Sequence, residues 1–566
     1  MKRNKIIITL FTGMTLLSAC HDLNLNPLSY GSTESWYSDE TEVEMAVNEL
    51  YRNVFWPIDE DTNTDWSDDN IYRESLSEFQ NATLNGQHSQ VTNLWSNQYK
   101  VISRANSIIN KAQRAIENGA SESTINAFIA EAHFHRASAY AKLSQKFGAV
   151  PLVENDVDIE EGLTMGRTDL ATIKQFVYDE YDKAIEVLPV SYTDEQRATK
   201  GAALALKARY ALYMGDYAIA AEAAKAVIDL GVYSLHPNYQ ELFLQGTKTS
   251  PENIFVMARS IEFGIYTDAQ YPLPRNHGGY AAPNPTWDLF ASYVCTDGLP
   301  IDESPLFDPH DPFKNRDPRL SMTIVPFGEN FLGIEYNPHP EVLEVMNYNT
   351  GEMILNNDTR ANAQYASYNG LVWKKGLDES CLENAFRTEP NRIIVRYADV
   401  LLIYAEAKIE LNQIDQSVLD AMNEVRARAY GVDKSATDQY PAFTATDQKT
   451  LRSQLRMERR MEFPKEGLRY MDLIRWKLMD KVMSKKVYMM LYPSSLLIEK
   501  VVNEGDWFWP FAPDIDENGL VDFTKIEATG KIAVIAQKNW DDRQYLWPIP
   551  TTEIQINPNM KQNPGY

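Results

Sequence analysis

Residues 197–231 constrain the fold more than any other part of the sequence. They read RATKGAALALKARYALYMGDYAIAAEAAKAVIDLG, and their apolar side chains recur at helical spacing on both sides of Gly215-Asp216. Small residues such as Ala205 and Ala220 stand where two neighbouring helices must approach closely. The segment therefore predicts two antiparallel helices joined by a tight turn.

Further helical pairs are expected in three other parts of the chain, at 94–147, 397–431 and 451–479. Helical hairpins with a period of about 34 residues are typical of tetratricopeptide repeats, which stack into a right-handed solenoid. By contrast, residues 265–390 and 484–550 are rich in Pro, Gly, Tyr and Asn and show little periodicity. We predict a mainly α protein, a tetratricopeptide-like superhelix carrying an irregular, loop-rich ligand-binding subdomain.

The first twenty residues predict a lipoprotein signal peptide. Lys2, Arg3 and Lys5 precede an apolar run that ends at Leu17-Ser18-Ala19-Cys20. This pattern is typical of a lipobox, in which residues 1–19 are removed and Cys20 is acylated. Acyl chains on Cys20 would hold the protein at a membrane surface, and no later apolar run reaches transmembrane length.

Charge and cysteine content exclude some functions. The net charge is −25, which disfavours nucleic acid as a partner. Beyond Cys20 the chain contains only Cys295 and Cys381, and their spacing in sequence leaves open whether they pair. Stability is therefore expected to depend on packing and not on a disulfide framework.

One pair of acidic residues superficially fits catalysis. Glu458 and Glu462 are four residues apart on one predicted helix, and a glycosidase needs two carboxyl groups beside the bond it cleaves. Arginines alternate with acids throughout this stretch, however, which favours a network of structural ion pairs. His133 and His135 lie on opposite sides of a helix and cannot share a metal. We expect no enzymatic activity.

A calcium site is a further hypothesis, at residues 514–525. Asp514, Asp516, Asn518 and Asp522 occupy positions that match an EF-hand loop, but Lys525 stands where the bidentate glutamate belongs. The alternative is a hairpin turn at Asn518-Gly519. No other cofactor is expected.

Two aromatic and polar loops are the candidate ligand sites, because ligand sites generally combine apolar walls with a few polar groups. The first surrounds Trp66 in a polar loop, although a Trp packed beneath the loop is an open alternative. The second is YTDAQYPLPRNHGGY, at 266–280. Trp373, Trp507 and Trp509 are weaker alternatives. The candidate residues are Asp65, Trp66, Asp68, Asp69, Tyr72 and Arg73 in the first loop, and Tyr271, Arg275, Asn276, His277 and Tyr280 in the second.

Five segments in order resemble the SusD/RagB family. They are CHDLNLNP, AEAHFHRASAYAKLSQKFGAVPLV, NRIIVRYADVLLIYAEA, MERRMEFPKEGLRYMDLIRW and YLWPIPTTEIQINPNMKQNPGY. The resemblance implies a family-like N-terminal region with helical hairpins at 20–264, an irregular ligand face at 265–390, and a C-terminal region at 391–566 with further hairpins. It implies a ligand face built from the loop before the first hairpin and from the irregular region.

The same resemblance implies a function and a location. Members of this family are outer-membrane lipoproteins that capture oligosaccharides outside the cell and pass them to a SusC-like TonB-dependent transporter barrel. Peptide binding by the same architecture is the alternative, because part of the family resembles peptide importers. Aromatic and amide-bearing loops favour a sugar, whereas peptide capture favours free strand edges.

Overall fold

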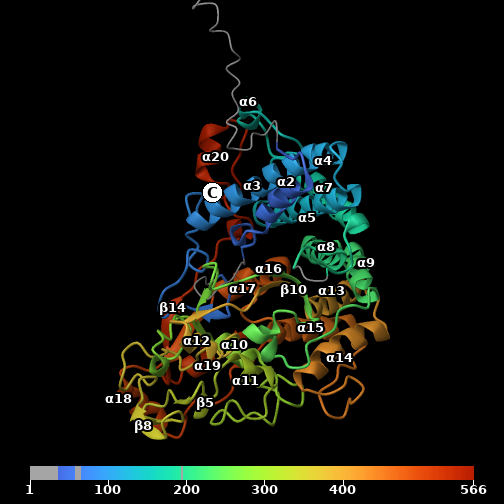
Figure 1. Ribbon diagram of the computed structural model, residues 1–566. Helices are drawn as coiled ribbons and strands as arrows, with labels where there is room; N and C mark the ends of the chain where they lie inside the picture. The colour runs from blue at the N-terminus through green and yellow to red at the C-terminus, as the bar shows by residue number, and fades with distance from the viewer. Residues whose placement is uncertain (1–35, 58–65, 193–195) are drawn as a thin grey trace, which may run out of the picture.

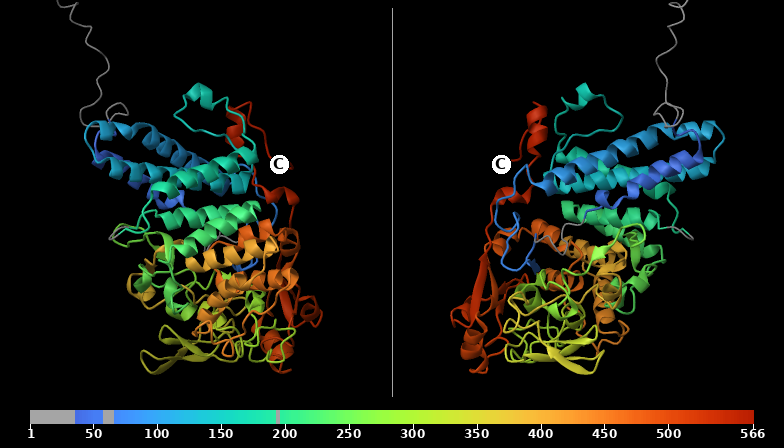
Figure 2. Two further views of the ribbon diagram at one scale, coloured as in Figure 1. Left: turned by 90° about the vertical axis from the view of Figure 1, so that its right-hand side faces the viewer. Right: turned by 60° about the vertical axis from the view of Figure 1, so that its left-hand side comes forward.

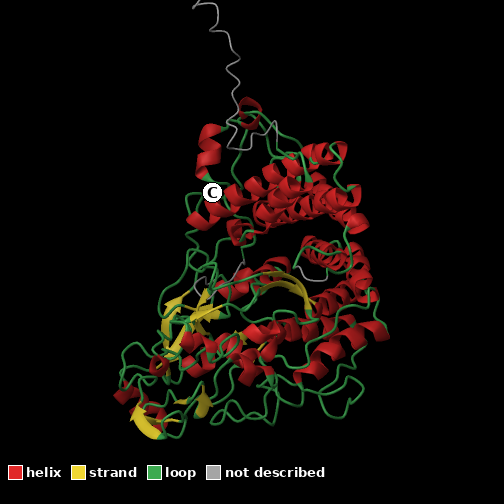
Figure 3. Cartoon of the chain, in the orientation of Figure 1, coloured by secondary structure: helices red, strands yellow, loops and turns green. Residues whose placement is uncertain are grey.

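Helices dominate one end of the molecule, and loops with short strands dominate the other (Figure 1 and Figure 3). The computed structural model describes residues 36–57, 66–192 and 196–566, so Cys20 and Asp65 lie outside the described residues. The longer helices are α2 (Glu40–Asn48), α3 (Ser89–Lys111), α5 (Glu122–Phe147), α7 (Leu170–Val187), α8 (Lys200–Met214), α9 (Tyr217–Asp229), α13 (Tyr397–Glu410), α14 (Gln416–Ala429), α15 (Gln448–Glu462) and α16 (Arg469–Arg475). Shorter helices are α4 (Gln113–Glu117), α6 (Ile159–Gly162), α10 (Trp287–Ser292), α11 (Arg319–Thr323), α12 (Ser380–Glu383), α17 (Met479–Met483), α18 (Ser494–Leu497), α19 (Thr524–Glu527) and α20 (Thr551–Ile556).

The predicted hairpin at 197–231 is confirmed as α8 and α9. The Thr199 side chain caps the first turn of α8 by accepting a hydrogen bond from the backbone N–H of Ala202. Gly215 ends the helix in the left-handed conformation, at φ 77°, which a residue with a Cβ adopts only at a cost. Ala205 and Ala220 are fully buried, so their small size lets the backbones approach.

Successive helices continue this packing through the structure. Helix α3 packs on α5, α5 on α7, α7 on α8, and α9 on α13, which in turn packs on α14 and α15. The two views of Figure 2 show these helices stacked in layers from the blue N-terminal pair to the orange C-terminal ones. The mainly α fold class is thereby confirmed, and the stack is compatible with tetratricopeptide-like hairpins.

The strands are short and lie mostly in the irregular part, as its composition predicts. Among the described residues, only β5 to β8 form a sheet of more than two strands, in antiparallel order β5-β6-β7-β8. A second buried cluster around Trp287, Phe508 and Trp509 packs beneath this part, separate from the core between the helices. The strands are β1 (Asn70–Ile71), β2 (Asn253–Met257), β3 (Thr267–Asp268), β4 (Asn284–Pro285), β5 (Glu329–Phe331), β6 (Ile334–Tyr336), β7 (Glu344–Asn347), β8 (Glu352–Leu355), β9 (Arg387–Thr388), β10 (Arg392–Arg396), β11 (Lys486–Met490), β12 (Asp514–Ile515), β13 (Val521–Asp522) and β14 (Ile532–Gln537).

Buried ion pairs fasten the irregular part to the helices. Glu462 on α15 binds Arg319 at 2.9 Å and Arg396 at 2.7 Å, and it also pairs with Arg428. Burial alone would raise the pKa of Glu462, but these three guanidinium groups outweigh it and hold the pKa at about 2. Glu458 is likewise buried and binds Arg319 at 2.8 Å. Both carboxylates therefore belong to the predicted ion-pair network.

Cys295 and Cys381 do not cross-link the fold. Cys295 and Cys381 are both buried, and each is a free thiol. In the part of the chain that the structure describes, no helix combines the length and the apolar character needed to cross a bilayer.

Candidate functional site

The structure overturns the assignment of Trp66 to a ligand surface. The indole is 5 % exposed and stacks on Phe79, with ring centroids 4.5 Å apart. The rings of Trp547 and Tyr470 pack edge-on against it at 5.3 and 5.6 Å. Trp66 therefore belongs to the core, which is the alternative that the sequence left open.

The acidic residues beside Trp66 are structural as well, so their assignment to the ligand site was wrong. Asp68 and Asp69 are both 3 % exposed. Asp68 accepts hydrogen bonds from Nε and Nη2 of Arg469 at 2.9 and 3.0 Å, and Asp69 accepts from Arg460 at 2.9 Å. Burial would raise the pKa of Asp68, but Arg460 and Arg469 hold that pKa well below its usual range. The acidic residues Asp68 and Asp69 thus form buried ion pairs and do not lie on a solvated surface.

Tyr72 and Arg73, three and four residues after Asp69, are half-buried. Strand β1 pairs with β4, Asn70 opposite Pro285, which brings this loop beside the 271–280 segment. Nη2 of Arg73 donates a hydrogen bond to the carbonyl oxygen of Tyr280 at 3.2 Å. Two loops more than two hundred residues apart in sequence therefore meet, as a shared ligand face requires.

The second predicted loop divides into tyrosines that face outward and residues that shape its turn. The rings of Tyr271 and Tyr280 lie edge to face, 5.4 Å apart, and Tyr280 is 38 % exposed. His277 is buried and its Nε2 lies 2.8 Å from the Phe331 carbonyl oxygen, so its assignment as a ligand residue was wrong.

Arg275 and Asn276 also bond within the protein. Nη1 of Arg275 donates to the carbonyl oxygen of Gly279 at 2.8 Å. The side-chain oxygen of Asn276 accepts from the backbone N–H of Asn357 at 2.9 Å. The backbone N–H groups of Arg275 and Asn276 both donate to the carboxylate of Asp358, which is buried, and burial raises the pKa of Asp358 to about 7. These residues hold the turn that presents Tyr271 and Tyr280.

Sequence reasoning missed further residues of the same surface. The Arg73 guanidinium lies 4.9 Å from the ring centroid of Tyr365. Arg360 lies between two other rings, 4.1 Å from Tyr368 and 4.0 Å from Tyr492. Tyr365 and Tyr492 are 48 % and 47 % exposed. We call this surface the tyrosine–arginine face, and it comprises Tyr72, Arg73, Tyr271, Tyr280, Arg360, Tyr365, Tyr368 and Tyr492.

The tyrosine–arginine face has the chemistry of a site for an extended polar ligand. Exposed ring planes supply flat apolar surface, and the arginines supply N–H donors fixed by the rings they contact. The signal in the sequence was the pair of tyrosines in NAQYASYNG, a stretch with no helical or strand period to bury them. The weaker candidates Trp373 and Trp509 are buried, and Trp507 packs 4.8 Å from His339.

The residues proposed for calcium form the alternative hairpin. Strands β12 and β13 pair Asp514 with Asp522, and Gly519 turns the chain at φ 73°. Lys525 binds Asp514 at 2.7 Å, and Asp516 accepts the backbone N–H of Asn518 at 2.8 Å. Among the residues that the structure describes, no three His, Cys, Asp or Glu side chains converge to hold a metal ion. The geometry therefore does not support the calcium hypothesis.

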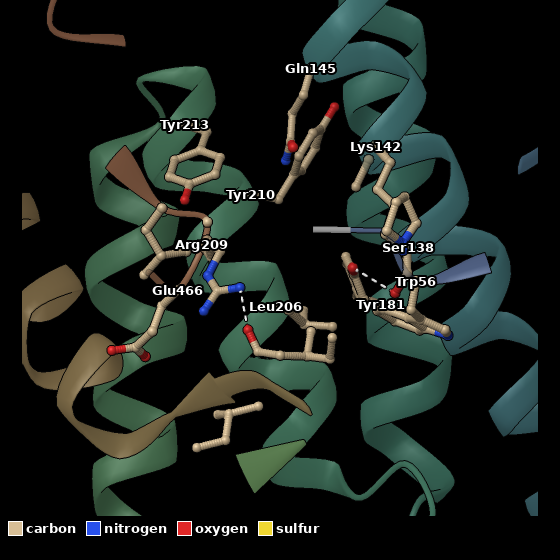
Figure 4. Close-up of a pocket in the computed structure, with 16 residues that line it drawn as sticks. Trp56, Ser138, Lys142, Gln145, Tyr181, Leu206, Arg209, Tyr210, Tyr213 and Glu466 are labelled. Carbon is tan, nitrogen blue, oxygen red and sulfur yellow. Dashed lines mark hydrogen bonds between the residues drawn. The ribbon is translucent and has the colours of Figure 1, made fainter. Parts of the chain in front are cut away.

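A cavity between the helix layers is a less suitable site. It lies among α5, α8 and β10 and is lined by Tyr210, Arg209 and Glu466 among others (Figure 4). Its volume is 110 Å³, below the roughly 300–1,000 Å³ of usual ligand pockets. Arg209 already binds Asp399, and Glu466 already binds Arg396 and Lys375.

Comparisons with known proteins agree with the fold. Residues 252–566 match the model of the SusD family, and residues 37–212 match a model described as starch-binding associating with outer membrane. The SusD-like proteins P25 and P2 of Formosa agariphila are each 25 % identical to this chain. The match to P25 covers 88 % of this chain and 94 % of P25, and the match to P2 covers all of both.

Solved structures extend the comparison. A SusD-like carbohydrate-binding protein from Bacteroides fragilis superposes with a TM-score of 0.74 at 28 % identity, over 93 % of this chain and 99 % of that one. A laminarin-binding SusD-like protein has the same fold, with a TM-score of 0.63 at 20 % identity over 94 % of this chain and all of that one. Since one family model alone accounts for more than half of the residues, the chain belongs to the SusD family.

Proposed function

We propose that this protein is a non-catalytic oligosaccharide-binding lipoprotein of the outer membrane, anchored through Cys20. The observation that carries the proposal is the tyrosine–arginine face, where exposed tyrosines and two arginines meet from four separate segments. Sugar rings stack their C–H faces on such planes while the surrounding donors bind their hydroxyl groups. The carbohydrate-binding relative from Bacteroides fragilis supports the same ligand class.

The oligosaccharide is then delivered to a SusC-like TonB-dependent transporter, with the tyrosine–arginine face directed to the cell exterior. Family membership supports this partner, and the description of the family model matched by 37–212 supports the outer membrane. The burial of Glu458 and Glu462 in ion pairs supports binding without hydrolysis, because a glycosidase needs both carboxyl groups at the bond it cleaves.

An array of oligosaccharides and peptides probed with the purified full chain tests the proposal. We expect retention by one class of oligosaccharide and none by peptides, because the strands bordering the face, β1 and β4, are two residues long and offer little edge for peptide pairing. The Tyr365→Ala variant should lose retention. The control is Tyr348→Ala, which removes a ring that is 50 % exposed on the turn after β7, outside the face. Retention by peptides alone would overturn the proposal.

A further inference from the structure

Arg360 is a cation that the protein itself does not neutralise. Its guanidinium lies between the rings of Tyr368 and Tyr492, and its Nη1 is 3.9 Å from the sulfur of Met489. Its Nε is buried and has no hydrogen-bond partner. Across the ranges that the structure describes, no carboxylate forms an ion pair with Arg360. Burial lowers the pKa of this guanidinium, and the neighbouring Tyr368, Tyr492 and Glu74 offset that effect only in part.

Arg73, on the same surface, is a second cation with no carboxylate partner among the described residues. Its Nη2 donates a hydrogen bond to the carbonyl oxygen of Tyr280, its guanidinium contacts the ring of Tyr365, and its Nε is buried without a partner. Within the described part of the chain it too forms no ion pair with a carboxylate. Burial and then the charge of Glu74 raise the pKa of Tyr368, and Arg360 and Arg73 both oppose that rise. The two guanidinium groups therefore lie near the same ring.

Other buried arginines either pair with carboxylates or, like Arg316, donate their N–H groups to backbone carbonyl oxygens, here those of Phe290, Tyr293 and Pro312. Arg319 binds Asp317, Glu458 and Glu462, all within 2.9 Å. The chain carries a net charge of −25, so carboxylates are abundant. In the vicinity of the two unneutralised arginines, Glu74 is the acid that acts on Arg360, and it is exposed and forms no ion pair with it among the described residues. The tyrosine–arginine face is thus locally cationic on an acidic protein.

We propose that the oligosaccharide bound at this face is anionic and carries carboxylate or sulfate groups that pair with Arg360 and Arg73. The inference rests on the proposed function and narrows its ligand class. A guanidinium donates two parallel N–H bonds to a carboxylate or sulfate, and such charge-assisted bonds are about twice as strong as neutral ones. A neutral sugar would cover both cations and leave their charge uncompensated.

The test compares each glycan with its neutralised counterpart. The full chain in detergent is titrated calorimetrically with oligogalacturonide and with the same oligosaccharide after reduction of its carboxyl groups. A second arm uses sulfated carrageenan oligosaccharides and their desulfated forms, and a third uses neutral glucans and mannans. We expect an acidic glycan to bind best, neutralisation to weaken its binding at least about tenfold, and added salt to weaken it further. The two acidic arms identify whether the anion is a carboxylate or a sulfate.

Matched variants locate the effect. Arg360→Gln and Arg73→Gln should each reduce affinity for the acidic glycan about tenfold and reduce affinity for its neutralised form by a clearly smaller factor. Arg360→Lys keeps the charge but cannot donate two parallel N–H bonds. Its affinity for the acidic glycan should therefore lie between that of Arg360→Gln and that of wild type. Arg387→Gln is the control, because Arg387 also contacts an exposed ring, that of Tyr266 at 4.8 Å, outside the face.

The outcomes separate this inference from the proposed function. Tight binding of a neutral glycan that Arg360→Gln, Arg73→Gln and Arg360→Lys all leave unchanged would overturn the inference and leave the proposed function standing. Binding of an acidic glycan that Arg360→Gln and Arg73→Gln leave intact, with melting temperatures unchanged, would also overturn it. Binding of no glycan of any class would overturn both.

Discussion

Replacement of Trp66 by alanine should damage stability and spare ligand affinity. The indole is 5 % exposed, and three aromatic rings lie with centroids 4.5, 5.3 and 5.6 Å from its own. Removing such a side chain from a core costs about 3–5 kcal/mol, because the transfer free energy is lost and a cavity remains. The lost ring pairs, worth about 0.5–1.5 kcal/mol each, are part of that cost.

The expected shift in melting temperature follows from the size of the chain. Unfolding entropy is about 2.1 cal/mol/K per residue, so 566 residues give ~1.2 kcal/mol/K and the variant should melt ~3–4 °C lower. Thermal melts report the stability, and calorimetric titration below the transition reports the affinity. Tyr348→Ala is the control and should change stability by less than about 0.5 kcal/mol. Lost affinity at an unchanged melting temperature would refute the burial argument and restore Trp66 to the ligand site.

Four further predictions concern the ion-pair network, its pH dependence, the anchor and the chemistry. Glu462→Gln leaves Arg319, Arg396 and Arg428 short of a buried charge and should cost about 3–5 kcal/mol in urea denaturation; a loss below about 1 kcal/mol would contradict the network's role. Because the pKa of Glu462 is lowered to about 2 in the folded protein from an ordinary 4.5, its contribution is complete above pH 4.5 and is lost as the pH falls toward 2; a wild-type stability that does not fall across that range would contradict this. Cys20→Ala should release the protein from the membrane fraction, and continued labelling of the variant with a fatty-acid analogue would contradict lipidation at Cys20. A bound oligosaccharide incubated with the protein should be recovered uncut by chromatography, whereas protein-dependent cleavage products would show an enzyme.

The helices could be predicted because their signals are local. Spacing of apolar side chains, a capping Thr199 and a terminal Gly215 are each contained in a few residues. The ion pairs of Glu458 and Glu462 were also foreseeable from alternating charge, although their partners Arg319 and Arg396 come from distant segments that the sequence did not indicate.

The ligand face was harder to predict because exposure depends on tertiary contacts. The segment DWSDDNIYR contains both buried and exposed residues, and composition could not tell Trp66 and Asp68 from Arg73. The buried members are covered by Phe79 and by Trp547 and Arg469, the last two of which lie far along the chain. Arg360 escaped notice because its significance comes from two tyrosine rings, one of them more than a hundred residues away.

The most direct test of the central claim is a calorimetric titration of the best oligosaccharide from the array against Tyr280→Ala. Replacing an aromatic side chain at the centre of a site by alanine weakens the binding free energy by about 2 kcal/mol. The affinity should therefore fall about thirtyfold. The ring is 38 % exposed, and the melting temperature should therefore stay within about 1 °C of wild type. An affinity equal to that of wild type and of Tyr348→Ala would contradict the claim that the tyrosine–arginine face binds the oligosaccharide.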